Sequence, residues 1–583
     1  MALSSYASFC SFIFIPSVSH HKTTNSENSK LIRNSYYDDP TPQRWSNINT
    51  HNHNTLLSST HPLQNFKPLP KYPCTNIDHD LEIYRELIRK AGEDRPFEGL
   101  KIVDAIQRLG IDYIFEEEID VILQKQYKFL NDHHHQDLHE VALRFRLLRQ
   151  HGHFIPADVF NKFKDSKGMF DKMLSEDING LISLYEASHL SIDGEHILDE
   201  AALFTTQHLI NTSMMRRSLN HYQTTFVANT LKNPTHKTLS KFTAKNLFGV
   251  HPSMNEYINL FKELAKSEFN KVQFLHRGEI DQVTKWSRKI GLGKELEFAR
   301  IQPLKWYIWS LGCLTDPILS QQRVELTKAV SFIYIIDDIF DVYGSLDELI
   351  LFTQAVSSWE NSDIEKLPEY MKICFEALDN MINESCHVVY QKHGWSPLHS
   401  LRKTWGRLCH SFLVEAKWFA SGHVANTEEY LKNGVVSSGI PALLLHIFLL
   451  LGQGLTSKNA LDFVENMPPI VTSTASVVRL WNDLGNAQDK NPKGDDGSYV
   501  ECYMKEREGS SIEDACENII EKTSYAWKCL NKECIMNPNP VIPPTFQKAC
   551  LNFARVVPLR YTYNDDNQQN LEELVKSILY ESL

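Results

Sequence analysis

Apolar residues recur every three to four positions through most of the chain. Between residues 115 and 130 this spacing places six side chains on one face of a helix, and Gly110 supplies a helix stop just before them. These six side chains are Phe115, Ile119, Ile122, Leu123, Tyr127 and Leu130. No stretch combines strand-like alternation with paired turn signals. From about Leu81 onward, the pattern predicts an all-α fold.

The longest apolar run is "IPALLLHIFLLLG", which starts at Ile440 and contains His446. A helix that crosses a bilayer needs about 20 apolar residues, and this run is shorter. We therefore expect a buried core helix and no membrane span. In contrast, the acidic run from Glu116 to Glu118 is expected to form the solvated first turn of its helix, where acids favour the helix dipole.

A chain of 583 residues exceeds the usual size of one domain. We predict a division near Asn270, with one helical domain over residues 66–270 and a second over residues 271–583. Residues 1–65 are expected to be a polar tail. Its first 26 residues contain no Asp or Glu and are rich in Ser, and no Lys or Arg precedes the run "SFIFIPSV". These features favour a plastid transit peptide over a secretory signal; a cytoplasmic chain with a disordered tail is the alternative.

Composition narrows the range of partners. The formal charge of -12 and the pI near 6.1 give no electrostatic basis for binding nucleic acid. The eleven cysteines are scattered and form no C-x-x-C pair, which is typical of free thiols in a reducing compartment. A small or neutral partner fits this composition better.

Three aspartates end a helix that is otherwise strongly apolar. In "VELTKAVSFIYIIDDIFDVYGS", Asp337 and Asp341 fall on the same face and Asp338 lies beside them. Desolvated carboxylates repel one another unless a cation offsets them. Oxygen ligands without His or Cys select Mg²⁺ or Mn²⁺, and Mg²⁺ usually shares its coordination sphere with phosphates. The alternative is a solvated helix end near Gly344.

A second helix, "VVRLWNDLGNAQDK", carries further oxygen donors. Asn482, Asn486 and Asp489 follow one another at spacings of four and three residues, so they can share a face. Lys490 comes directly after them, and its ammonium group would oppose a metal ion there. The helix is thus a candidate metal-binding face with one residue that argues against it.

Together these segments resemble the class I plant terpene synthases. "DDIFD" matches the aspartate-rich motif of that family, and "RLWNDLGNAQDK" resembles its second metal motif. "FARIQPLKWYIW", "NGVVSSGIP" and "CLNFARVVPLRYTYNDD" are similar to its Arg-x-Arg segment, its kinked helix and its closing loop. "VDAIQRLGIDY" and "LYEASHL" extend the similarity into the first half. The resemblance covers roughly Phe97 to the end. It implies a barrel-like amino-terminal helical domain, a carboxy-terminal class I terpenoid synthase bundle, and a monomer.

The resemblance also implies roles for individual residues. Three Mg²⁺ ions, with Mn²⁺ as a substitute, would bind a prenyl diphosphate substrate. Their ligands would be Asp337, Asp338, Asp341, Asn482 and Asn486, with Asp489 replacing an expected Glu. Arg300 and Arg479 would hold the diphosphate, together with Asp337, Asp341 and Asn482. Trp309 would line the cavity for the carbocation, and Tyr561 and Asp565 would belong to the closing loop.

The chain departs from the family pattern at four places. Gln302 stands for the second arginine of the Arg-x-Arg segment, Asn486 for a Ser or Thr, and Lys490 for a Glu. The family's Arg-Arg pair eight residues before a Trp is also absent, because Trp45 has no such pair before it. Members without that pair resemble those that make acyclic products, so we expect linalool from geranyl diphosphate and nerolidol from farnesyl diphosphate.

Other functions were weighed against this one. An acyclic olefin synthase making myrcene or ocimene is the first alternative. A catalytically impaired paralogue acting as a binding or scaffold protein is the second, suggested by Lys490 and Gln302. A chain-elongating prenyltransferase should carry a second D-D-x-x-D, and an acid-initiated cyclase should carry D-x-D-D. The sequence contains neither motif.

Overall fold

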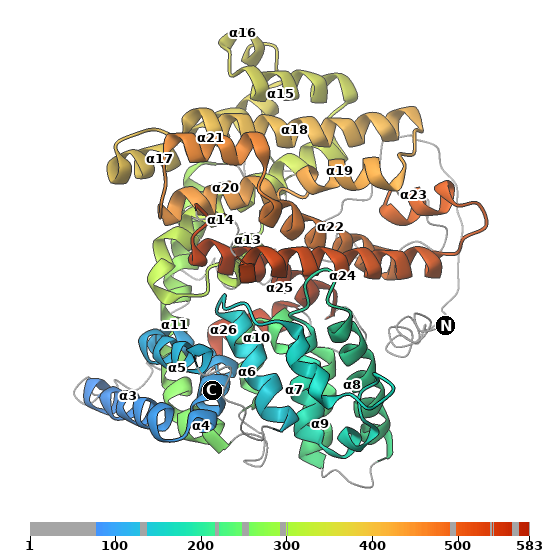
Figure 1. Ribbon diagram of the computed structural model, residues 1–583. Coiled ribbons are helices and arrows are strands. Elements are labelled where there is room, and N and C mark those ends of the chain that lie inside the picture. The colour runs from blue at the N-terminus through green and yellow to red at the C-terminus, as the bar shows by residue number, and fades with distance from the viewer. Residues whose placement is uncertain are drawn as a thin grey trace.

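The computed structural model describes residues 77–128, 137–215, 221–247, 256–291, 296, 299, 301–489, 497–536, 539, 541–562 and 571–581. Within these ranges the protein is built from helices, with one isolated bridge between Lys164 and Phe170 and no strand. The predicted all-α class is confirmed. Figure 1 shows two helical halves that meet along a seam, with α24 and α25 running beside it.

The first half packs short helices around one apolar core, which contains Leu100, Phe145 and Phe160. Its helices are α3 (Ile77–Asp94), α4 (Pro96–Arg108), α5 (Glu116–Lys128), α6 (Leu138–Gln150), α7 (Ile178–Ser188), α8 (His196–Met215), α9 (His221–Lys232), α10 (Ser240–Leu247) and α11 (Glu256–Lys289). Short turns η1 (Asp112–Ile114), η2 (Ala157–Phe163), η3 (Lys172–Glu176) and η4 (Thr235–Lys237) connect them. Gly110 has φ +70°, which fits the predicted helix stop.

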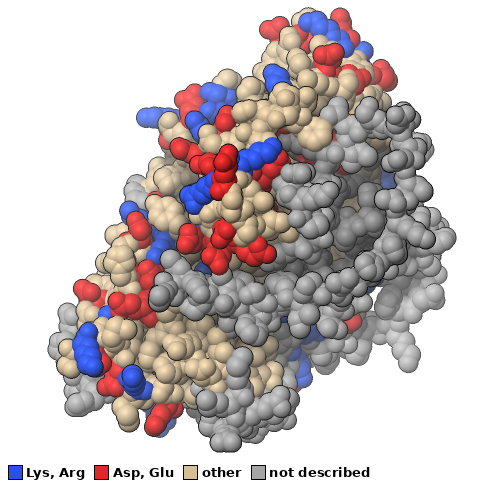
Figure 2. Space-filling model, turned by 90° about the vertical axis from the view of Figure 1, so that its right-hand side faces the viewer, with Lys and Arg blue, Asp and Glu red and all other residues tan. Residues whose placement is uncertain are grey.

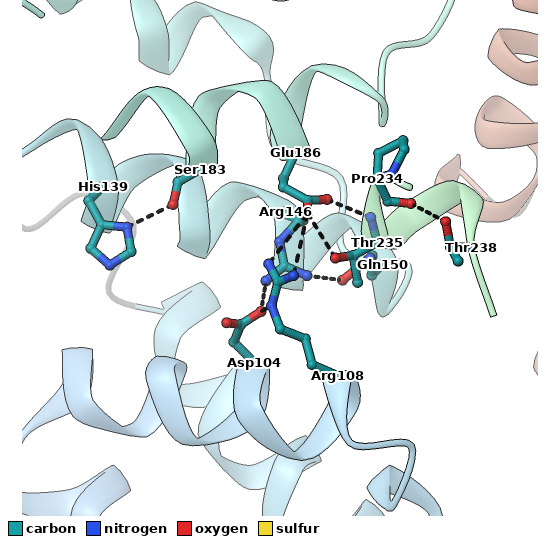
Figure 3. A network of polar contacts seen from close by, with 10 residues as sticks. All are labelled: Asp104, Arg108, His139, Arg146, Gln150, Ser183, Glu186, Pro234, Thr235 and Thr238. Carbon is teal, nitrogen blue, oxygen red and sulfur yellow. Dashed lines mark hydrogen bonds and ion pairs between the residues drawn. The ribbon is translucent and has the colours of Figure 1, made fainter. Parts of the chain in front are cut away.

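A buried polar network ties this half together (Figure 3). Asp104 on α4 accepts hydrogen bonds from Arg108 at 2.8 Å and from Arg146 on α6. Arg108 also reaches Glu186 on α7, and Glu186 accepts from the backbone N–H of Thr235 at 2.8 Å and from its hydroxyl at 2.9 Å. The network therefore fixes η4, which lies at the seam, to three helices of the first half.

Helix α11 belongs to both halves. Its first turns place Ile258 and Phe261 in the core of the first half, and Trp286 near its end packs on the core of the second. The helix is continuous through residue 270, where a division was predicted. The boundary at that residue stays a prediction, and α11 gives the two halves one shared element.

The second half is a larger bundle around a main apolar core and a second, smaller apolar cluster. Its helices are α13 (Pro303–Cys313), α14 (Ser320–Asp338), α15 (Leu346–Ser358), α16 (Asn361–Ile364), α17 (Glu369–His393), α18 (Leu398–Ser421), α19 (Thr427–Ser437), α20 (Ile440–Leu451), α21 (Ser457–Asn466), α22 (Pro469–Asp489), α23 (Tyr499–Glu506), α24 (Ile512–Met536), α25 (Pro544–Thr562) and α26 (Leu571–Tyr580). Two short segments, η5 (Pro317–Leu319) and the π-helical η6 (Ile339–Tyr343), flank α14.

The predicted core helix is α20. The segment Thr427–Leu451 is the one stretch of the described residues that is long and apolar enough to cross a membrane, and 89% of its most apolar window is buried inside the protein. His446 is 1% exposed and accepts a hydrogen bond from Trp405, and burial lowers the pKa of His446 to about 4. The imidazole is therefore neutral at neutral pH, as a core position requires.

Two residues of α5 depart from expectation, while Glu116 and Glu117 are exposed as predicted. Tyr127 is 42% exposed and stacks on His153 instead of joining the core. Glu118 is 2% exposed and forms ion pairs with Arg85 and Arg89, both at 2.8 Å. The two guanidinium groups compensate the negative charge of this buried carboxylate.

The surface and the thiols agree with the composition. Figure 2 shows acidic and basic side chains interspersed over one flank of the described surface, and its coloured residues form no broad field of one sign. The nine cysteines in the described ranges are all free thiols.

Candidate active site

The three aspartates of "DDIFD" lie at the change from α14 to a π-helical turn. Asp337 and Asp338 end α14, and Asp341 lies within η6, which closes with a hydrogen bond of 2.8 Å from the N–H of Gly344 to the carbonyl of Ile339. Such π-turns occur mostly as single turns at functional sites. A Cβ at Gly344 would come within 2.6 Å of the Leu349 side chain, so a larger residue there would require Leu349 to shift.

These carboxylates are buried. Asp337 and Asp338 are 3% exposed and Asp341 is 8% exposed. The alternative of a solvated helix end is therefore wrong. Burying three acids within five residues is costly, and this cost is what a cation at the site would offset.

The kink between α19 and α20 joins this cluster to the second motif. Gly439 has φ +74°, and a Cβ there would lie 2.8 Å from Ile333, which is one turn before Asp337 on α14. On the other side, a Cβ at Gly434 would lie 3.2 Å from the side chain of Arg479 on α22. The segment "NGVVSSGIP" thus packs against both α14 and α22, and its two glycines permit the close approach.

Arg479 is held by a network that sequence reasoning missed. Its guanidinium is 3% exposed and donates to the hydroxyl of Tyr430, from Nη2 at 2.6 Å and from Nε at 3.0 Å. The Tyr430 hydroxyl donates in turn to the carboxylate of Asp483 at 2.9 Å. Arg479 also approaches Glu415 at 3.4 Å and Asp483 at 3.6 Å. Three helix-borne side chains therefore fix one arginine.

The Glu415 carboxylate also accepts hydrogen bonds from the kinked segment. Its carboxylate accepts from the hydroxyl of Ser437 at 2.7 Å and from the amide of Asn433 at 3.2 Å. Ser437 also accepts from Arg479 at 3.1 Å. A signal for Asp483 was present, because it lies one turn after Arg479 in the same motif. Nothing local in the sequence marks Glu415 or Tyr430.

Trp309 lies next to the helix that carries the aspartates. The indole N–H donates to the hydroxyl of Tyr334 at 3.0 Å, and Tyr334 precedes Asp337 by three residues on α14. The ring of Phe553 on α25 is 6.3 Å from the Trp309 ring. An aromatic wall is therefore present near the carboxylates.

The other predicted residues divide into two groups. Asn482 is 9% exposed and Asn486 is half-buried, both on α22 one and two turns after Arg479. Gln302 is half-buried at the start of α13, where its side chain makes no capping bond. Arg300, Lys490 and Asp565 lie outside the described residues, as do the side chains of Asp489 and Tyr561.

Comparison with known proteins identifies the family. The family model described as "Terpene synthase family, metal binding domain" matches residues 288–529, and the one described as "Terpene synthase, N-terminal domain" matches residues 56–231. An (E)-nerolidol synthase of Cannabis sativa is 65% identical over 541 residues, which cover 90% of this chain and 97% of that protein. This chain belongs to the terpene synthase family. It is a lyase acting on prenyl diphosphates.

Two further relatives place this terpene synthase among enzymes with known structures and products. The S-(+)-linalool synthase of Arabidopsis thaliana, named as chloroplastic, is 45% identical over 86% of this chain and 88% of its own. Isoprene synthase of grey poplar has a crystal structure with three Mg²⁺ ions and dimethylallyl-S-thiolodiphosphate. It is 31% identical with a TM-score of 0.79, covering 87% of this chain and 97% of that one. The class I terpenoid synthase fold is confirmed.

The donor set of this terpene synthase fits a divalent metal shared with substrate. Within the described residues, no three His, Cys, Asp or Glu side chains converge closely enough to hold an ion by themselves. Mg²⁺ needs no such cage, since it keeps waters and binds through one or two carboxylates plus substrate phosphates. The buried carboxylates of α14 and η6 and the amide oxygens of α22 are hard oxygen donors of the required kind.

Proposed function

We propose that this terpene synthase ionises geranyl diphosphate to give linalool and farnesyl diphosphate to give nerolidol. The observation that carries the proposal is the kinked segment of residues 434–440, which packs against α14 beside the aspartates and against Arg479 on α22. A binding region between α14 and α22 suits a diphosphate, because the aspartates of α14 supply metal ligands on one side and Arg479 supplies a positive charge on the other.

In this proposal the diphosphate is held both by arginine side chains and by metal ions. Arg479 and Arg300 bind phosphate oxygens, because a guanidinium fork matches them and keeps its proton. Asp337, Asp338 and Asp341 hold divalent ions, and so do the α22 residues Asn482, Asn486 and Asp489. Three Mg²⁺ ions are proposed by analogy with the isoprene synthase complex, and Mn²⁺ is proposed as a substitute. Bound there, such ions neutralise the leaving diphosphate.

The remaining chemistry needs no protein nucleophile. Once the carbon–oxygen bond to the diphosphate breaks, the allylic cation is stabilised by ring faces such as that of Trp309. Asp565 belongs to the loop that excludes bulk water, whereas Tyr561 was expected in that loop and lies in the last turn of α25 before it. A single water then adds its oxygen to the tertiary carbon and loses a proton, which leaves a tertiary alcohol. Loss of a proton from the cation itself would give myrcene or ocimene instead.

Two features favour an acyclic alcohol. No Arg-Arg pair precedes Trp45, and the relatives named above are a nerolidol synthase and a linalool synthase. We also propose import into plastids, because the first 26 residues lack Asp and Glu and several relatives are named chloroplastic. A monomer is proposed.

Product analysis tests the proposal. Purified protein is incubated with Mg²⁺ and with geranyl or farnesyl diphosphate, and the volatile products are separated by chiral gas chromatography. Linalool and nerolidol are expected, and chelation of Mg²⁺ should remove both. Acyclic olefins as the main products would favour the alternative reaction. Absence of any product would favour a scaffold role, in which Gln302 and Lys490 have ended catalysis.

A further inference from the structure

A cavity of about 670 Å³ lies at the seam between the two halves, apart from the candidate active site. Its walls come from η1, η4, α10 and α11 on one side and from α25, α26 and the segment 315–317 on the other. This volume is in the range of small-molecule binding sites. The polar network of Figure 3 holds one wall in place, because Glu186 fixes Thr235 at the start of η4.

Lys241 on α10 is a half-buried cation in this cavity that lacks an acidic partner. Its ammonium donates to Nε2 of His276, and no ion pair joins it to any described carboxylate. The His276 ring is 1% exposed, and burial lowers the pKa of His276 to about 3, so the imidazole is neutral. Burial also lowers the pKa of Lys241 to about 7. The neutral His276 ring accepts a hydrogen bond from Lys241 but does not compensate the positive charge of its ammonium group.

The nearest acid is already committed to another cation. His276 Nδ1 lies 2.7 Å from the Tyr307 hydroxyl, which donates to Glu279 at 2.6 Å. Glu279 in turn forms a paired contact with Arg323, from Nε at 2.8 Å and from Nη2 at 2.7 Å. The carboxylate is therefore neutralised by Arg323, and the neutral ring of His276, whose Nδ1 lies 3.7 Å from Glu279, stands between it and Lys241.

Arg555 on α25 is the second such cation. Its Nε donates to the carbonyl of His236 at 2.7 Å and its Nη1 donates to the amide oxygen of Asn552 at 2.9 Å. These acceptors are neutral, and among the described residues no carboxylate lies within ion-pair distance of the guanidinium. Burial lowers the pKa of Arg555 to about 10. An arginine in this situation retains N–H groups for the oxygens of a phosphate group.

The acids that line the same cavity are accounted for separately. Asp112 pairs with Lys548 at 3.4 Å. Asp316 accepts from the N–H of Ile318 at 3.0 Å. Glu268 accepts from the hydroxyl of Tyr113 at 2.9 Å and pairs with Lys271.

Two more acids in the lining, Glu116 and Asp120, are exposed to water on α5. Lys241 and Arg555 therefore remain as lining cations that no carboxylate of the described residues pairs with, while Lys548 on the same wall pairs with Asp112.

We propose that this cavity binds a small organic phosphate, with Lys241 and Arg555 on its phosphate group and Leu239, Val272 and Leu551 against its hydrocarbon part. A phosphate monoester carries nearly two negative charges at neutral pH, which matches two cations that no described carboxylate pairs with. The apolar lining residues supply the contact for the rest of the molecule. This site is separate from the one that ionises the diphosphate.

Calorimetric titration with hexyl phosphate, inorganic phosphate and hexanoate tests the site in the full-length protein, with EDTA present so that metal-dependent binding is absent. Hexyl phosphate should bind most tightly. Lys241→Met and Arg555→Met should each weaken it about tenfold or more, while Lys548→Met and the active-site variant Asp338→Asn should leave Kd unchanged. Equal or tighter binding of hexanoate would overturn the choice of a phosphate. Equal Kd values for the Met variants and wild type would overturn the site.

Hydrogen exchange of the unmodified protein provides a measurement that needs no variant. Hexyl phosphate should slow exchange in α10 and along α25 near Arg555. Slowing confined to α14 and α22 would mean that the ligand enters the active site, and it would contradict the proposal.

Discussion

The hydroxyl of Tyr430 is one oxygen atom that connects the candidate diphosphate arginine to a buried carboxylate. It accepts from Arg479 at 2.6 Å and donates to Asp483 at 2.9 Å, on a side chain that is 1% exposed. Tyr430→Phe removes this atom and keeps the ring, on which the Arg479 guanidinium stacks at 4.7 Å. The change therefore isolates hydrogen bonding from packing.

The expected loss of stability follows from these contacts. Each hydrogen bond to a charged group contributes about 1.5–3 kcal/mol, and three are lost, two from Arg479 and one to Asp483. Much of this is recovered, because Arg479 already lies 3.6 Å from Asp483 and can pair with it directly. We expect Tyr430→Phe to lower the free energy of unfolding by about 2–4 kcal/mol. We also expect kcat/KM to fall about tenfold to a hundredfold, since the arginine is displaced toward Asp483.

Tyr499→Phe is the matched control. The Tyr499 ring is also buried and lies 6.0 Å from the Tyr430 ring, but its hydroxyl donates to the neutral amide oxygen of Asn518 at 2.8 Å. This variant should lose about 1 kcal/mol and keep its kcat/KM. The assays are urea unfolding followed by circular dichroism, and steady-state kinetics with Mg²⁺. If the two variants behaved alike in both assays, the idea that Tyr430 positions Arg479 would be refuted.

Three more predictions concern charges. Asp338→Asn should keep the fold and lower kcat/KM about a thousandfold or more, because the metal ions proposed to bind the diphosphate lose a carboxylate ligand. Near-normal turnover would show that Asp338 is not part of the site. Lys490→Glu should keep or raise activity and lower the Mg²⁺ requirement, whereas Asp489→Ala should lower activity. Titration of turnover with Mg²⁺ measures both effects. If Asp489→Ala had no effect and Lys490→Ala were inactive, the lysine would instead be a phosphate ligand. Desolvation would raise the pKa of Glu279, but the hydrogen bonds from Arg323 hold it well below its usual value of 4.5. The stability that the ionised Glu279 contributes is therefore full above pH 4.5 and is lost as the pH falls below that value. Glu279→Gln should therefore lower the free energy of unfolding by about 3–5 kcal/mol at neutral pH and flatten its decline in acid, as urea unfolding across pH would show; an unchanged pH dependence would contradict this.

Local patterns predicted those parts of the molecule in which neighbours in sequence are also neighbours in space. The spacing of apolar residues predicted helices, and the apolar surroundings of Asp337, Asp338 and Asp341 predicted their burial. The resemblance of "NGVVSSGIP" to a kinked family segment predicted a kink, and the structure shows close contacts at both of its glycines. These predictions depend on one helix or one turn at a time.

Contacts between distant helices could not be predicted in this way. Glu415 on α18 and Tyr430 on α19 meet Arg479 on α22 only in the folded bundle, and neither carries a local signal. Glu118 resembled a solvated acid because its partners Arg85 and Arg89 come from another helix. Likewise, nothing local to residue 270 showed that α11 would continue through it, because the two ends of α11 pack on different cores; the division there stays a prediction.

The central claim is that the carbon–oxygen bond of an allylic diphosphate breaks at the aspartate cluster and that water captures the cation. Turnover of geranyl and farnesyl diphosphate with Mg²⁺ in heavy-oxygen water tests this directly, with the products examined by gas chromatography and mass spectrometry. Linalool and nerolidol whose hydroxyl oxygen comes from the solvent are expected. Primary alcohols that keep the substrate's oxygen, or no terpenoid product, would contradict the claim.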